Sequence, residues 1–159
     1  MKIGVTSDTH SIKIPRQLIE DFSHVDLIIH AGDFCTPNDA KVFSKLGEIR
    51  AVQGNMDDDG IRSRFPEKQV FICEGKRIGL YHGRGSRATI LQSVMKEFEG
   101  QMLDIIIFGH SHMPFNETIK GTLYFNPGSP NDTLGTDACS YGMIEIDGGQ
   151  ITSKIIKVK

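Results

Sequence analysis

Seven side chains that could bind a divalent metal ion follow five short apolar runs of the chain. They offer carboxylate, imidazole and amide donors, a mixture that suits transition-metal ions. Asp8 and His10 stand two residues apart, and His110 and His112 repeat this spacing, so each pair projects to one side of an extended chain. Such donors predict a pair of ions that activates water for hydrolysis. The complete set is Asp8, His10, Asp33, Asn55, His82, His110 and His112.

The apolar runs themselves predict the strands that would bring these donors together. Runs this short, interleaved with helical patterns, are typical of buried strands in an α/β sheet. Binding sites in such sheets lie beyond the carboxyl ends of the strands, so the donors should meet in one crevice. The runs cover residues 3–5, 27–29, 49–52, 78–81 and 105–108.

Each donor has an ordinary structural alternative when it is taken alone. A strand-end aspartate is often a helix cap, an asparagine after glycine is often a turn residue, and a histidine is often a hydrogen-bonded core residue. The metal interpretation depends on all the strand ends carrying donors together. Asp33 is the candidate to bridge two ions, one with each oxygen, and Asn55 offers a neutral amide oxygen.

The remaining pattern predicts one domain over residues 1–159, without internal repeats or linkers. Thr36 and Pro37 should open a helix as N-cap and first helical residue. Residues 57–60 read as a polar turn, residues 118–125 as containing a hairpin, and residues 126–130 as a rigid turn. We expect helices at 14–22, 38–46 and 86–99, and strands at 2–7, 26–29, 48–53, 69–73, 76–81, 103–108, 141–146 and 151–158.

Composition excludes several classes of function. The 159 residues carry a formal net charge of -2 and no dense cluster of Lys and Arg, which argues against general nucleic-acid binding. No apolar run is long enough to cross a bilayer, so no membrane partner is expected. The three cysteines form no CxxC pair and suit a reducing compartment, which predicts a cytoplasmic location. A small anionic substrate remains possible, because bound metals bring positive charge that the sequence count omits.

The order D-x-H, G-D, G-N, H-G and G-H-x-H resembles the calcineurin-like metallophosphoesterases. The compact chain and the turn Asn126-Pro127-Gly128-Ser129 are similar to the small bacterial and archaeal phosphodiesterase branch of that family. The resemblance extends from Met1 to the final hairpin. It implies an α/β fold, a four-layer α/β/β/α sandwich of two mixed sheets, with a dinuclear metal site where the strands end.

The resemblance also implies how the ligands divide. One ion would take Asp8, His10, Asp33 and His112, and the other would take Asp33, Asn55, His82 and His110. Manganese is the activating ion that the resemblance favours, with nickel, cobalt, zinc and iron as alternatives. Small relatives are often dimers or larger, so a homodimer or higher homo-oligomer stays open.

Two positions depart from the common family pattern. Met56 stands where many relatives have a histidine that is thought to protonate the leaving group, so a side-chain general acid is in doubt. Arg84 stands where many relatives have a second histidine, and it brings a permanent cation that could contact substrate. His30 reads as a core or supporting histidine, and Asp57 as a solvated turn residue that could also orient a ligand.

The sequence thus predicts a phosphodiesterase that hydrolyses diesters by in-line attack of a metal-bound hydroxide, with catalytic roles for Asp33, Asn55 and Arg84. One alternative is a phosphomonoesterase acting on a nucleotide or another small phosphate. A second alternative is a non-catalytic scaffold, because the eukaryotic retromer subunit resembles these enzymes but has altered site residues. The presence of all the ligand candidates argues against the scaffold.

Overall fold

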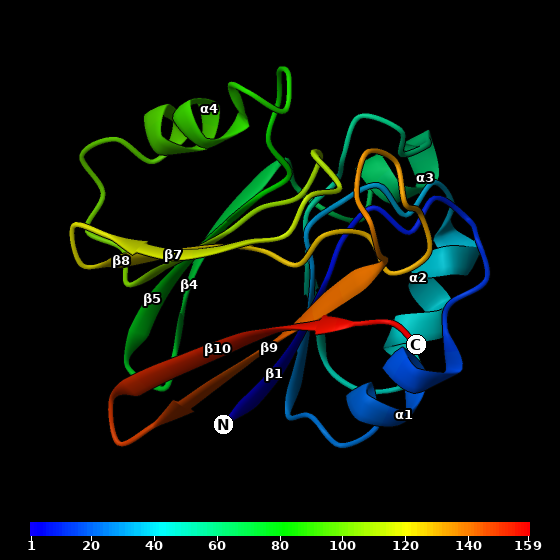
Figure 1. Ribbon diagram of the computed structural model, residues 1–159, viewed down its shortest axis with the longest axis horizontal. Helices are drawn as coiled ribbons and strands as arrows, with labels where there is room; N and C mark the ends of the chain where they lie inside the picture. Colours follow the sequence, from blue (N-terminus) through cyan, green and yellow to red (C-terminus); the bar gives the residue numbers. More distant parts are fainter.

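A computed structural model of the protein describes residues 1–159 and contains two stacked sheets of five strands each (Figure 1). The first sheet has the order β10 (Gln150–Lys157), β9 (Ser140–Asp147), β1 (Lys2–Thr6), β2 (Leu27–His30) and β3 (Ile49–Ala51). The second has the order β4 (Lys68–Cys73), β5 (Lys76–Tyr81), β6 (Ile105–Ile107), β8 (Thr122–Asn126) and β7 (Phe115–Ile119).

Both sheets are mixed, and in both the strands that precede the predicted ligands are parallel. In the first sheet β1, β2 and β3 are parallel, whereas β9 and β10 form an antiparallel hairpin beside β1. In the second sheet β5, β6 and β8 are parallel, and β4 and β7 pair antiparallel at the two edges. The parallel strands of each sheet therefore end at a common edge, as the sequence predicts.

The main hydrophobic core lies between the two sheets. Because side chains alternate along a strand, Ile3 and Val5 of β1 face the second sheet together. Ile78 and Leu80 of β5 face them from the other side, and all four side chains are fully buried. This alternation fixes the register of both sheets, since a shift by one residue would turn the apolar side chains outward.

Four helices cover the outer faces of the sheets (Figure 1). α1 (Arg16–Phe22), α2 (Pro37–Ser44) and the single turn α3 (Asp59–Arg62) pack on the first sheet through a second apolar cluster that contains Phe22, Phe43 and Ile61. α4 (Ile90–Glu97) packs on the second sheet through a third cluster. None of these helices is long and apolar enough to span a membrane. The predicted α/β/β/α sandwich of two mixed sheets is confirmed.

Most predicted elements are present, and two differ for identifiable reasons. The third predicted helix begins at Ile90 instead of residue 86, because Ser86 and Thr89 form a hydrogen-bonded turn before it. Residues 57–60 were predicted to be a polar turn, but α3 begins within them. Asp58 caps this helix by accepting a hydrogen bond of 2.9 Å from the Ile61 N–H. The hairpin predicted within residues 118–125 is formed by β7 and β8, which residues 120–121 join.

Candidate metal centre

The structure brings the seven predicted ligands to one edge of the sandwich. Five parallel strands end there, and a ligand-bearing loop follows each of them. The first sheet contributes the loops after β1, β2 and β3, with Asp8 and His10, Asp33, and Asn55 respectively. The second sheet contributes the loops after β5 and β6, with His82, His110 and His112.

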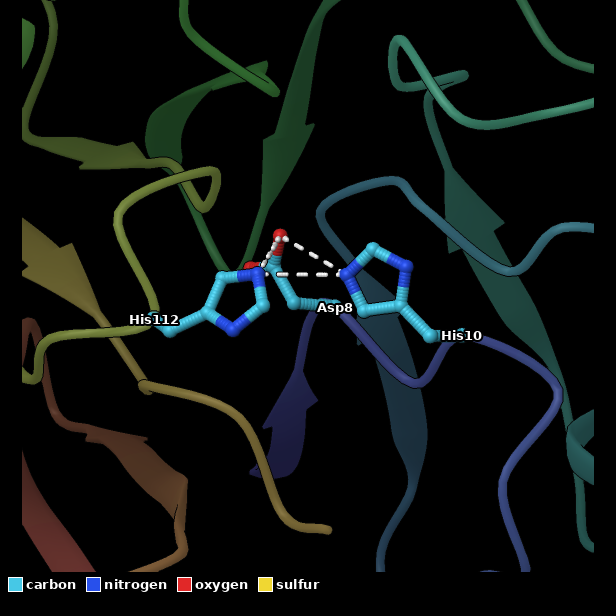
Figure 2. Close-up of side chains that lie close together, drawn as sticks. All are labelled: Asp8, His10 and His112. Carbon is cyan, nitrogen blue, oxygen red and sulfur yellow. Dashed lines mark hydrogen bonds and ion pairs between the residues drawn. The ribbon is translucent and has the colours of Figure 1, made fainter. Parts of the chain in front are cut away.

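One group of donors surrounds the Asp8 carboxylate (Figure 2). The Nε2 atoms of His10 and His112 lie 3.1 Å apart, and the Asp8 Oδ1 atom lies 3.4 Å from His112 Nε2 and 4.0 Å from His10 Nε2. The Asp33 Oδ2 atom is 3.8 Å from His10 Nε2. These residues are the ones predicted to hold the first ion.

A second group of donors lies on the other side of Asp33. His82 Nε2 is 3.3 Å from Asp33 Oδ2 and 3.2 Å from Asn55 Oδ1. The Nδ1 atom of His110 lies 2.9 Å from the same Asn55 oxygen. These residues are the ones predicted to hold the second ion. His82 Nε2 also lies 4.0 Å from Asp8 Oδ1, so both aspartates approach this group.

Asp33 approaches both groups through the same oxygen. Its Oδ1 atom accepts a hydrogen bond of 2.8 Å from the Met56 N–H, whereas its Oδ2 atom approaches His10 and His82. That each oxygen would serve one ion stays a prediction. Burial by itself would raise the pKa of Asp33, but the His82 imidazole and the Met56 N–H lower it below its usual range. The carboxylate is thus held in its anionic form.

Two of the four histidines are oriented by backbone carbonyl groups. His82 Nδ1 lies 2.7 Å from the carbonyl oxygen of Ala31, and His110 Nε2 lies 2.8 Å from that of Gly85. A carbonyl only accepts, so these nitrogens carry the proton in the neutral ring. The opposite nitrogens, His82 Nε2 and His110 Nδ1, face the centre, where they would supply lone pairs to a bound ion.

Side chains orient the other two histidines. His112 Nδ1 makes an ion-pair contact of 3.0 Å with Asp132 Oδ2, out of line for a hydrogen bond. His10 Nδ1 lies 3.8 Å from the Cys35 sulfur. Outer contacts of this kind fix the ring orientation of metal-binding histidines. Asp132 could not be predicted from the sequence, because only tertiary structure brings the loop after β8 beside His112.

The arrangement fits divalent cations. The Nε2 atoms of His10 and His112 lie 3.1 Å apart, close enough for both to bind one cation. Burial by itself would lower the pKa of His82, but Asp33 and Asp8 raise it to about 9, so the site draws positive charge into a buried position. Imidazole, carboxylate and amide donors suit manganese, iron, cobalt, nickel or zinc.

The backbone is left-handed at five of the seven predicted ligands. This conformation is uncommon for residues other than glycine and clusters at functional sites. Hydrogen bonds to the neighbouring loop hold it: the Asp8 N–H donates to Gly32 O over 2.9 Å, and the His10 N–H donates to Asp33 O over 3.1 Å. The φ angles are 56° at Asp8, 47° at His10, 59° at Asp33, 69° at His110 and 58° at His112.

Glycines beside the ligands let the loops approach closely. A Cβ atom on Gly54 would overlap Asp33, and one on Gly109 would overlap the Ser7 hydroxyl. Ser129 supports the centre from the predicted rigid turn, because its hydroxyl donates to the Asp8 carbonyl over 2.8 Å. The glycines of the G-D, G-N and G-H motifs thus have a steric role.

Asp57 links the loop that carries Asp33 to the loop that carries Asn55. It is only 4% exposed, and its carboxylate accepts hydrogen bonds from the backbone N–H groups of Cys35 (2.7 Å), Gly54 (2.7 Å) and Asp33 (3.1 Å). Burial raises its pKa, and the three backbone donors oppose that rise. The interpretation as a solvated turn residue was wrong, and the alternative interpretation as an orienting residue agrees with these contacts.

His30 is a supporting residue, as the sequence predicts. It is fully buried, accepts a hydrogen bond of 3.2 Å from the Gly32 N–H, lies 3.1 Å from the Thr9 hydroxyl, and stacks on Phe34. Burial lowers its pKa well below the usual value of 6.5. A neutral ring fits this environment, in which one nitrogen accepts and the other donates.

Met56 and Arg84 lie beside the ligand groups. Met56 is 58% exposed, and its thioether cannot donate a proton. The Arg84 side chain is 71% exposed, and its Nε donates to the Tyr81 hydroxyl over 2.5 Å. This contact holds the guanidinium at the rim of the pocket that Asn55 and His82 also line.

Comparison with known proteins agrees with this architecture. Residues 1–149 match the model of the calcineurin-like phosphoesterase superfamily domain. A probable metallophosphoesterase of Methanothermobacter thermautotrophicus is 36% identical over 164 positions, which cover 99% of this chain and 92% of the relative. The chain therefore belongs to the calcineurin-like phosphoesterase superfamily, and it is a metal-dependent phosphoric ester hydrolase.

Solved structures share the fold over the whole chain. A structure described as a novel archaeal phosphodiesterase superposes with a TM-score of 0.77 at 26% identity, covering 98% of this chain and 100% of that chain. Vps29 of Entamoeba histolytica complexed with zinc superposes with a TM-score of 0.75 at 21% identity, covering 99% of both chains. At that identity the second likeness shows the fold alone.

Proposed function

We propose that the protein is a dinuclear-metal-dependent phosphodiesterase. The main support for this proposal is that Asp33 Oδ2 approaches both groups of donors, at 3.8 Å from His10 Nε2 and 3.3 Å from His82 Nε2. Asp8, His10, Asp33 and His112 would hold one ion. Asp33, Asn55, His82 and His110 would hold the other.

Divalent ions held by these residues would supply an activated water at neutral pH, and we propose that hydrolysis would proceed by in-line attack of this hydroxide on phosphorus. The chain prepares this chemistry by keeping Asp33 anionic and by directing one ring nitrogen of each of the four histidines inward. We place Arg84 among the groups that bind substrate, because its side chain lies along the rim.

The leaving group must be protonated without help from a side chain at position 56. Hydrolysis forms one P–O bond to water and breaks another, and the leaving oxygen takes up a proton. Met56 faces solvent and cannot supply that proton. Diesters whose leaving groups are already acidic, such as nitrophenyl esters, should therefore react faster than alkyl diesters.

The test combines metal content with activity on paired substrates. The protein is loaded in turn with Mn, Ni, Co, Zn and Fe, analysed for bound metal, and assayed on bis(4-nitrophenyl) phosphate and 4-nitrophenyl phosphate. We expect two ions per chain, greatest activity with manganese and preference for the diester. Preference for the monoester would favour the phosphomonoesterase. A chain that binds no ion and cleaves neither ester would favour the scaffold.

A matched pair of histidine variants tests the ligand assignment. His110→Ala should lose the second ion and most of the activity, because His110 Nδ1 faces Asn55 Oδ1 at 2.9 Å. His24→Ala should retain both ions, because His24 is exposed and lies outside both groups. Full metal content in His110→Ala would contradict the assignment.

We also propose that the chain acts as a single domain in the cytoplasm. Residues 1–159 should act as one domain, because both sheets contribute donors to the site. The three cysteines are free, which suits a reducing cytoplasm.

A further inference from the structure

A polar pocket of about 290 Å³ opens directly beside the proposed second metal position. Asn55 and His82, two proposed ligands of that ion, form its inner wall. A substrate whose reacting phosphate sits on the ions would therefore extend one substituent into this pocket. Its outer wall contains two arginines, Arg62 and Arg84.

Arg62 is held in place by the loop that carries Asn55. Its Nε donates to the Asp57 carbonyl over 2.8 Å, and its Nη2 donates to the Asn55 carbonyl over 3.2 Å. A guanidinium has five N–H groups, so three remain free to bind a ligand. Arg62 is therefore a cation held in place by direct contact with Asn55, a proposed ligand of the second ion.

Arg84 is held on the opposite side by Tyr81. Its Nε donates to the Tyr81 hydroxyl, and its Cζ lies over that ring, 5.7 Å from the centroid. Glu97 is a distant partner, with 3.9 Å between its Oε2 and Arg84 Nη2. The terminal N–H groups of Arg84 thus remain available, as those of Arg62 do.

The rest of the pocket excludes apolar ligands. Gln53 and Glu67 supply polar side chains, and Tyr81 is the one hydrophobic residue in the lining. Neither an acyl chain nor a bare aromatic group would find an apolar wall there. The pocket lining has two guanidinium groups, of Arg62 and Arg84, and one carboxylate, of Glu67, so its net charge is positive. A guanidinium group pairs with phosphate oxygens in a bidentate geometry.

We propose that this pocket binds a second phosphoryl group of the substrate, so that the preferred substrates are polar phosphodiesters that carry an additional phosphate. Arg62 and Arg84 would be the binding residues, and Glu67 would limit the affinity by like-charge repulsion. The inference rests on the proposed phosphodiesterase function and narrows its substrate class.

The experiment uses two diesters that differ in one phosphate. Thymidine 5′-(4-nitrophenyl phosphate) is compared with the same compound carrying a 3′-phosphate, on the manganese-loaded protein. We expect the added phosphate to lower KM about tenfold and to change kcat little, as for solvent-exposed charge pairs acting together. The readout is the ratio of kcat/KM for the two substrates, so a general loss of activity in a variant cancels.

Three variants give the test its direction. Arg62→Ala and Arg84→Ala should each reduce the ratio toward one, whereas Glu67→Gln should increase it. Arg64→Ala is the matched control, because this exposed arginine lies over the Phe65 ring outside the pocket and should leave the ratio unchanged. A wild-type ratio near one, or a ratio unaffected by both pocket arginines, overturns the proposal.

Binding separates this proposal from the proposed function. Calorimetry compares thymidine 5′-monophosphate with thymidine 3′,5′-bisphosphate on the same metal-loaded protein and variants. Tighter binding of the bisphosphate that depends on Arg62 and Arg84 supports the pocket even if neither diester is cleaved, an outcome that would contradict only the phosphodiesterase. Equal affinities, or no binding of either nucleotide, count against the pocket.

Discussion

Replacement of Asp57 by alanine should damage the metal centre without removing any proposed ligand. The carboxylate accepts three backbone hydrogen bonds, from Cys35, Gly54 and Asp33, at 2.7–3.1 Å. Asp57→Ala leaves these three buried N–H groups without an acceptor. The loops that carry Asp33 and Asn55 then lose their common support.

The size of the effect follows from the number of bonds. A hydrogen bond to a charged group contributes about 1.5–3 kcal/mol, and some of this is recovered when water enters, so we expect a loss of about 3–5 kcal/mol in the free energy of unfolding. For a chain of this length that lowers Tm by roughly 10 °C. Asp57→Asn should lose about half as much, because an amide oxygen still accepts where Oδ2 does, but its NH2 group faces the Cys35 N–H.

The assay combines denaturant unfolding with metal titration. Asp57→Ala should also bind metal about 10–100-fold more weakly, which is the usual cost of removing an outer contact of a metal site. Asp59→Ala is the control from the same acidic triplet, because Asp59 is exposed. Equal stability and metal affinity in the Asp57 and Asp59 variants would refute the proposed support.

Three further results are expected. Gly109→Ala should unfold or fail to accumulate, because its Cβ would overlap Ser7, whereas Gly47→Ala, with open space around it, should be tolerated on a thermal melt. Folded His30 stays neutral while the unfolded chain takes up a proton below pH 6.5, so wild-type stability should fall as pH drops below that value, by up to about 1.4 kcal/mol per pH unit. His30→Phe should show a shallower slope in denaturant unfolding at successive pH values, and an unchanged slope would contradict the neutral ring. Met56→His should raise kcat/KM on alkyl diesters about tenfold or more relative to nitrophenyl diesters; no relative gain would mean that the leaving group is protonated in another way.

The fold was predictable wherever periodicity and turn residues agree. The hairpin predicted within residues 118–125 is present, with Lys120 and Gly121 in the turn between its two strands. α3 was not predictable in the same way, because a single helical turn is too short for helical periodicity. Its one buried residue, Ile61, and the Asp58 cap are visible only with the structure in hand.

The candidate site was predictable in its membership but not in its geometry. Strand ends determine which residues gather, so Asp33 and His110 could be assigned to one crevice from sequence. Their left-handed backbone could not, since local preference opposes it and tertiary hydrogen bonds maintain it. The single oxygen that Asp33 turns toward both groups likewise depends on the Met56 N–H, which lies in a different loop.

The division of the donors between the two sheets has a consequence for assembly. The first sheet offers carboxylates and an amide beside one imidazole, whereas the second offers imidazoles alone, through His82, His110 and His112. A folding intermediate with only one sheet in place would present half a coordination sphere. Full binding of an ion would then require that the two sheets have packed together. A small displacement of one sheet against the other would change the spacing of the donors, and hence the reactivity, without unfolding the chain.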